Sequence, residues 1–249
     1  MASFFENYIE ELLAYSASMV QENPNSQDVI STHLSLLYLN KYLKCPASHY
    51  SSQGTDFIGL LENSANMGDP LALFVFGMLN VEGLGSILPQ NRLIGHTFIA
   101  ASAFKKCYWA LNAMGAFYMQ GNGFVAKNFG EARKCFVSAL DSMSADKRTL
   151  RNLGLCCLYI GDYPEAIYYL KRAELQGDNT LVTIYNLQAR RLQEAQPLID
   201  SDDDAIKQVA YDFERISRLV DFYDVAMPEQ SSIVSVAARN RHNIQLAVN

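Results

Sequence analysis

The stretch AMGAFYMQGNGFVAKNFGEARKCFVSAL, residues 113–140, decides the fold class of this chain. The same spacing of alanine, glycine and phenylalanine occurs 38 residues earlier in the sequence. Eight pairs of identical residues match at this offset: Ala65 and Ala103, Ala72 and Ala110, Leu73 and Leu111, Gly77 and Gly115, Gly83 and Gly121, Gly85 and Gly123, Phe98 and Phe136, Ala101 and Ala139. The chain therefore contains an internal repeat, which is the sequence signature of stacked supersecondary units.

Each repeat predicts two helices joined by a glycine turn. Gly115 lies on the first helix, at a point where a neighbouring helix must come close. The Gly121-Asn122-Gly123 turn supplies the positive φ angles at which a helix can end. A second helix follows, and a large residue (Phe98 or Phe136) is expected to share one face with the alanine three positions on. Such a hairpin cannot bury its apolar face alone and must stack on the next one.

Helix boundaries are marked by residues typical of caps. Gly68 and Gly177 predict helix ends, and Asp69-Pro70 predicts the immediate start of another helix. Pro164 is expected in the first turn of a helix. Pro89 predicts that the second helix of the earlier repeat starts late.

The repeat resembles a known family. Residues 114–139 are similar to the Sel-one-like (Sel1-like) repeat, a relative of the tetratricopeptide repeat, and residues 65–103 resemble a weaker copy. Residues 153–173 resemble a tetratricopeptide repeat proper, with Gly154 and Gly161 in its frame. The resemblance implies an all-α fold: a right-handed α-solenoid of stacked helix hairpins with helical caps at both ends.

Three regions are expected along the chain. Residues 1–54 form an N-terminal helical cap or degenerate repeat, residues 55–195 the solenoid, and residues 196–249 a C-terminal helical cap and tail. The individual segments expected outside the clear repeats are helices at 4–21 and 26–44, a loop at 45–55, a continuation of the solenoid at 180–194, an amphipathic helix at 204–225, and a capping helix or tail at 230–249.

Composition excludes several classes of function. With 20 Lys and Arg against 26 Asp and Glu, the net charge is −6, so the basic footprint that nucleic acid or an anionic membrane requires is missing. The uncharged run 107–126 has membrane-spanning length, but its polar residues and glycine turn favour a buried helix. The acidic first residues do not resemble a secretory signal, and five cysteines without paired spacing indicate free thiols. A cytoplasmic protein is expected, or one exported without an N-terminal signal.

No constellation of residues predicts catalysis, a cofactor or a metal. The histidines lack metal-ligand spacing, and the cysteines of the repeats occupy positions where a small apolar residue packs. The glycine turns do not extend to a dinucleotide fingerprint, and their recurrence favours a structural role. The acidic run 200–204 fails as a calcium loop, because Ala205 and Tyr211 replace the required glycine and glutamate. The sequence therefore predicts a protein that is not an enzyme.

The resemblance implies a binding groove lined by the first helix of each repeat. The expected groove residues are Leu71, Phe74, Met78, Trp109, Asn112, Met119, Arg148, Arg151, Asn152 and Leu155. Arg148 and Asn152 share a helix face, with Arg151 nearby, and this combination suits a carboxylate. The alternative is a solvated basic helix end. The apolar members of the set form either a groove wall or core.

A scaffold or adaptor that holds a protein or peptide segment is the function that this sequence predicts. The alternative is an exported bacterial effector or regulator whose solenoid docks to a host or signalling protein. A third hypothesis is an enzyme with its site in the 45–55 loop or in the C-terminal helices. No motif in the sequence supports it.

Overall fold

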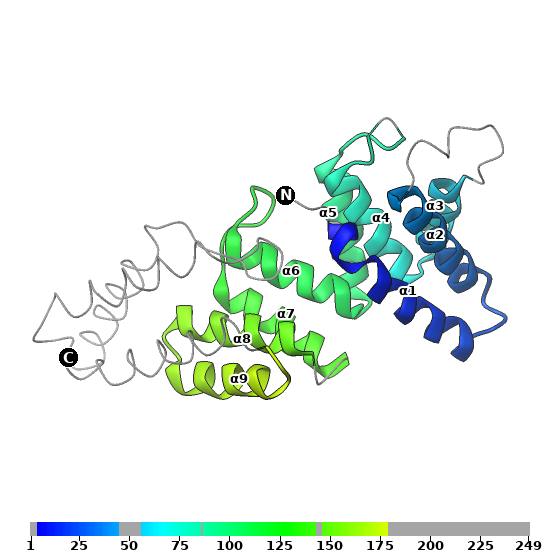
Figure 1. Ribbon diagram of the computed structural model, residues 1–249. Coiled ribbons are helices and arrows are strands. Elements are labelled where there is room, and N and C mark those ends of the chain that lie inside the picture. The colour runs from blue at the N-terminus through cyan, green and yellow to red at the C-terminus, as the bar shows by residue number, and fades with distance from the viewer. Residues whose placement is uncertain (1–3, 45–55, 86, 143–145, 179–249) are drawn as a thin grey trace, which may run out of the picture. The chain divides into compact units, whose positions relative to one another are not determined.

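The computed structural model describes residues 4–44, 56–85, 87–142 and 146–178 (Figure 1). Within these ranges every helix or strand that forms is an α-helix, apart from one isolated antiparallel bridge between Leu84 and Leu88. The helices are α1 (Phe4–Glu22), α2 (Gln27–Lys44), α3 (Phe57–Met67), α4 (Pro70–Glu82), α5 (Arg92–Phe104), α6 (Tyr108–Gln120), α7 (Phe129–Ser142), α8 (Lys147–Ile160) and α9 (Tyr163–Leu175). The all-α prediction is confirmed, and the expected segments at 45–55, 180–194, 204–225 and 230–249 lie outside the described residues.

The chain divides into two compact units, Met1–Ala110 and Leu111–Asn249. The division falls inside helix α6, so the first residues of this helix belong to unit 1 and the remainder to unit 2. Successive helices pack on one another in each unit: α1 on α2, α2 on α3, α3 on α4 and α4 on α5 in unit 1, and α7 on α8 and α8 on α9 in unit 2. Each unit is a stack of antiparallel helices.

The predicted close approach between paired helices is present in both units. In unit 1 a Cβ atom at Gly77 would lie 2.9 Å from the carbonyl oxygen of Gly95 and 2.8 Å from the Ile99 side chain, so only glycine fits there. In unit 2 a Cβ at Gly115 would lie 2.6 Å from the Phe136 ring. Paired helices therefore touch at the small residues that the repeat places on the first helix.

Cap residues begin and end the helices as their sequence predicts. Gly68 has a φ of 90° and ends α3 in the left-handed conformation. Asp69 follows at once as the N-cap of α4, and its carboxylate accepts a hydrogen bond of 2.8 Å from the Ala72 N–H, while Pro70 opens the helix. Pro164 lies in the first turn of α9, and Pro89 precedes the late start of α5 at Arg92.

Helix α5 differs in register from the expectation. The 38-residue offset predicts that Phe98 and Ala101 occupy the positions of Phe136 and Ala139, which are fully buried on α7. On α5 the buried residues are instead Gly95, Ile99 and Ser102, one position further along the chain. Phe98 is half-buried against the Phe76 ring and Ala101 is exposed, so the prediction is wrong by one residue here. Gly95 explains the shift, because only a glycine can meet Gly77 in backbone contact.

The uncharged run at 107–126 becomes a 13-residue helix followed by a glycine turn, as expected. Gly121 and Gly123 in that turn have φ angles of 69° and 86°. Among the helices of the described ranges, none combines the length and the apolar character that crossing a membrane requires.

Candidate binding faces on helices α4 and α8

The apolar groove residues predicted in unit 1 are all buried. They are Leu71, Phe74 and Met78 on α4 and Trp109 at the start of α6, and we call them the α4 face. The Phe74 and Trp109 rings stack with centroids 6.3 Å apart. Each of these side chains has lost nearly all of its contact with water.

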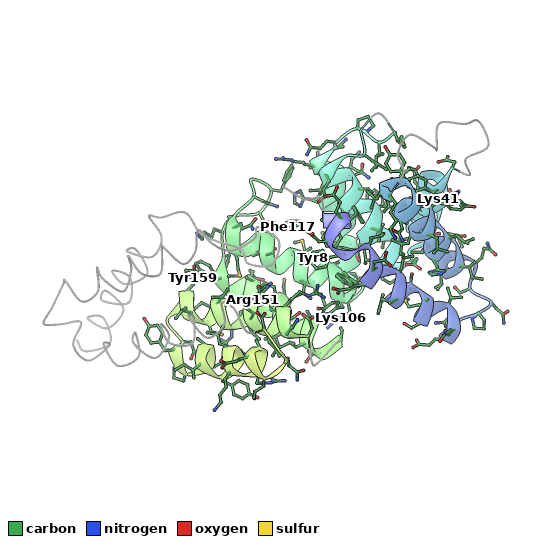
Figure 2. All side chains as sticks on the ribbon, viewed as in Figure 1. Tyr8, Lys41, Lys106, Phe117, Arg151 and Tyr159 are labelled. Carbon is green, nitrogen blue, oxygen red and sulfur yellow. The ribbon has the colours of Figure 1, made fainter. Side chains whose placement is uncertain are left out.

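Helix α1 supplies the residues that cover the α4 face. The Phe4 ring meets the Phe74 ring edge-on at 5.6 Å and the Trp109 ring at 6.5 Å. The Tyr8 ring (Tyr8 is labelled in Figure 2) lies 6.1 Å from Trp109. The backbone N–H of Phe4 donates a hydrogen bond of 2.8 Å to Glu82 at the far end of α4. Aromatic residues of the chain itself therefore occupy the predicted groove in unit 1.

The predicted apolar residues of unit 2 also lie in a core. Met119 and Leu155 are fully buried in one cluster with Phe136, Leu153 and Leu170. This cluster holds α7, α8 and α9 together. Of the residues predicted for the groove in unit 2, only the polar Asn112 and Arg148 are partly exposed, and Arg151 and Asn152 are buried.

Three of the predicted polar residues lie on α8, and the fourth, Asn112 on α6, is linked to α8 through Thr149. We call this set, which comprises Asn112, Arg148, Arg151 and Asn152, the α8 face. The Thr149 hydroxyl lies 2.8 Å from the Asn112 Oδ1 atom and 2.7 Å from a carboxylate oxygen of Asp146, the N-cap of α8. This hydroxyl therefore links α6 to the first turn of α8.

The two arginines of the α8 face both lie beside carboxylates of the chain itself. Arg151 (labelled in Figure 2) places its Nη1 atom 2.6 Å from Asp178, with side chains that are 8% and 11% exposed. Arg148 is 23% exposed, and its Nε atom lies 3.5 Å from Asp146, too far for a strong ion pair. Arg151 thus binds a carboxylate, as the sequence suggested for this face, but the carboxylate belongs to the residue that follows α9 by a few positions.

Asn152 has an unusual environment. The residue is buried, and its Oδ1 atom has no hydrogen-bond partner within the described part of the chain. A buried amide oxygen left in this state costs about 1–3 kcal/mol, because it has lost its water and gained nothing. The atom is an unused acceptor that is closed off from solvent, so a donor from outside the chain reaches it only when the side chains around it move.

The cysteines of unit 2 have the properties of packed thiols rather than of nucleophiles. Cys156 donates from Sγ to the Phe129 carbonyl oxygen at 2.9 Å, and Cys157 lies 3.6 Å from Glu165, which also pairs with Arg133. Burial, with the Glu165 carboxylate beside it, raises the pKa of Cys157 to about 12. These thiols stay protonated at neutral pH, whereas thiol nucleophiles react as thiolates. No group of three potential ligands suited to a metal occurs among the described residues.

Sequence comparison finds no matching family model and no matching curated protein. Two solved structures are similar to this chain. The first is a Sel1 repeat protein from Oxalobacter formigenes, with a TM-score of 0.41 and 24% identity over 51% of this chain and 95% of that one. The second is a protective antigen present in uropathogenic Escherichia coli strains, with a TM-score of 0.49 and 18% identity over 76% of this chain.

Both are described as Sel1-type repeat structures. This chain covers only 38% of the length of the E. coli antigen. The stacked helix hairpins of the present chain are established by its own glycine contacts and caps, described above.

Proposed function

We propose that this chain is a protein-binding module and that the α8 face of unit 2 holds an extended segment of its partner. The observation that carries the proposal is Asn152, a buried amide whose Oδ1 atom has no hydrogen-bond partner among the described residues. A backbone N–H of a bound segment is a suitable donor once the side chains over this atom move aside, since an extended chain presents such groups free of internal bonds.

Arg148 adds charge to this face. Its guanidinium is partly exposed and lies one helical turn from Asn152, so a single bound segment would lie beside both residues. Its contact with Asp146 is long, and a partly exposed guanidinium is suited to a charge-assisted hydrogen bond with a carboxylate of the partner. The proposed segment is therefore extended, with a carboxylate near the N-terminal end of α8.

Arg151 has a supporting role in this proposal. Its ion pair with Asp178 ties α8 to the chain that leaves α9, and so it fixes the wall on which Asn152 lies. The α4 face is not part of the proposed site, because Phe4 and Tyr8 already fill it. Binding rather than catalysis is also supported by the protonated, packed thiols of unit 2.

Affinity capture with the full chain as bait tests the proposal. Capture is compared between the wild-type chain, Asn152→Leu and Arg148→Glu, with the amount of each recovered protein quantified by mass spectrometry. The matched control is Lys171→Glu, which changes an exposed charge on α9. The expected result is a protein whose recovery falls by about tenfold with both α8 variants, a change that corresponds to 1.4 kcal/mol, and is unchanged with the control. Equal recovery with all four baits would remove the α8 face from consideration.

A further inference from the structure

The outward face of helix α5 is an apolar stripe without a single charge. Leu93, Thr97, Ala100 and Phe104 are spaced by four, three and four residues, which aligns them along one side of the helix. All of them are exposed, and Leu93 and Phe104 reach 66% and 89%. The stripe lies opposite the residues that α5 buries, Gly95, Ile99 and Ser102, and we call it the α5 stripe.

The corresponding faces of α7 and α9 each contain charge. On α7 the exposed side opposite the buried residues carries Lys134 and Asp141, and on α9 it carries Lys171 between the exposed side chains of Tyr168 and Leu175. The one-residue change of register in α5 accounts for the difference. In the register of α7, Arg92 and His96 would point outward, whereas the actual register turns Leu93 and Thr97 outward. An apolar surface of this length on a soluble helix marks a contact site more often than a free surface.

Cations flank the α5 stripe at both ends. Arg92 begins the helix and Lys105 caps it, and neither has an ion-pair partner within the described part of the chain. Their Cα atoms are separated by 13 helical steps, or about 20 Å. The stripe itself contains no carboxylate that would compensate them.

The stripe has large side chains at its ends and small ones in its middle. Thr97 and Ala100 have smaller side chains than Leu93 and Phe104, and small residues at a contact allow two helix axes to approach to about 8–10 Å. This shape fits a helix that lies across or along α5. We propose that the α5 stripe docks an amphipathic helix of a partner protein, with apolar residues in its middle and carboxylates at both ends.

Two other occupants fit the observations less well. A second copy of the chain, related by a two-fold axis through the stripe, would pair Leu93 with Phe104 but would also set Arg92 against Lys105. An anionic lipid surface would attract the same cations. However, it gains nothing from the small side chains at Thr97 and Ala100, and it repels a chain of net charge −6.

The experiment uses the full chain and two synthetic helical peptides of about 16 residues, which span about 24 Å. Both peptides carry the same leucine and alanine stripe. One has glutamates at each end and the other has lysines. Binding is measured by fluorescence anisotropy for the wild-type chain, Leu93→Ser, Phe104→Ser and the double variant Arg92→Glu with Lys105→Glu. The matched control is Leu175→Ser, which removes an apolar side chain that is 77% exposed on α9.

The acidic-ended peptide is expected to bind the wild-type chain at least about tenfold more tightly than the basic-ended one. Leu93→Ser and Phe104→Ser should each weaken binding of the acidic-ended peptide by about tenfold. The double charge reversal should make the basic-ended peptide the tighter binder. The control Leu175→Ser should leave the affinity for both peptides unchanged. Equal binding of the two peptides, or no binding of either, would overturn the proposal. Two other results would also overturn the proposal. One is a dimer of the chain, detected by light scattering, that Phe104→Ser abolishes. The other is sedimentation of the chain with phosphatidylserine vesicles that Phe104→Ser abolishes.

Because Leu93 and Phe104 are exposed, their replacement leaves the core intact, and unchanged thermal unfolding of the variants verifies this. The α5 stripe belongs to unit 1 and the α8 face to unit 2, so the two proposals fail separately. Loss of partner capture by the α8 variants says nothing about peptide binding at α5.

Discussion

The α4 face and the α8 face derive from the same position of the repeat, yet they have opposite contents. In unit 1 the position is apolar and filled, because Phe4 and Tyr8 from α1 pack on Phe74 and Trp109. In unit 2 Arg148 and Arg151 occupy the positions of Leu71 and Phe74, and the adjacent Asn152 has a buried acceptor without a partner among the described residues. The difference shows that the environment of the first helix of a repeat depends on which other parts of the chain pack against it.

The largest expected effect tests whether the α4 face is core. Phe74→Ala should lower the free energy of unfolding by about 3–5 kcal/mol, since it removes a fully buried ring and leaves a cavity. Urea denaturation followed by circular dichroism measures it, with Leu175→Ala as a control that should change little because Leu175 is exposed. An unchanged midpoint for Phe74→Ala would mean that the face is open after all.

The second prediction concerns the ion pair of the α8 face. Arg151→Met should cost about 3 kcal/mol, because it leaves the nearly buried Asp178 carboxylate without its partner. The double variant Arg151→Met with Asp178→Asn should recover part of this loss, and urea denaturation of the single and double variants measures both. If the double variant is as unstable as the single one, the ion pair is not the source of the stability.

The third prediction contrasts two buried asparagines, one from each unit. Asn152→Leu should raise the free energy of unfolding by about 1–2 kcal/mol, since it removes an unsatisfied oxygen and keeps the number of side-chain heavy atoms. Asn80→Leu on α4 should not, because the Asn80 amide donates a hydrogen bond of 2.8 Å to the Phe76 carbonyl. A gain at both sites, or at neither, would remove the distinction between them.

The smallest effect is a dependence of stability on pH at the start of α4. Burial raises the pKa of Asp69 in the folded chain, so the folded state holds this proton more tightly than the unfolded state does. The contribution of Asp69 to stability is therefore full at pH values below its unfolded pKa and is lost as the pH rises through the folded pKa. Asp69→Asn should flatten this part of the curve of thermal midpoint against pH.

Asp28 supplies a control of the opposite sign. Its pKa is lowered by the hydrogen bond from Ser26, so its contribution is present above the unfolded pKa and is lost as the pH falls through the folded pKa. Asp28→Asn should therefore lower stability at neutral pH, and it should flatten the acidic part of the curve of thermal midpoint against pH. The same slope in both variants would contradict the assignment of Asp69.

Much of the fold follows from the glycine frame. Gly77, Gly115 and Gly154 are each needed where a partner helix leaves no room for a Cβ atom, so their recurrence predicts the hairpins without any knowledge of the packing. Asp69-Pro70 and Pro164 likewise predict where helices begin, because a cap acts through the backbone within one turn. Local chemistry of this kind can be recognised from the sequence alone.

The candidate site was less predictable, because its contents depend on residues far away in the chain. Nothing in the first residues marks Phe4 as the side chain that covers Phe74, which lies 70 positions later. The sequence position of Arg151 likewise predicts a groove residue, whereas in the structure its guanidinium lies beside the Asp178 carboxylate. Helical spacing indicates which residues share a face, but not what lies on the other side of that face.

The change of register in α5 has a consequence for how repeat proteins diversify. Moving a helix by one residue rotates every side chain by about 100°, so a loop that is one residue shorter or longer presents a different set of side chains to the outside. In this chain such a rotation has brought Leu93 and Phe104 to the surface of a helix that is apolar nearly all round. A new recognition surface can thus arise by a single insertion or deletion in a turn, with no substitution in the helix that displays it.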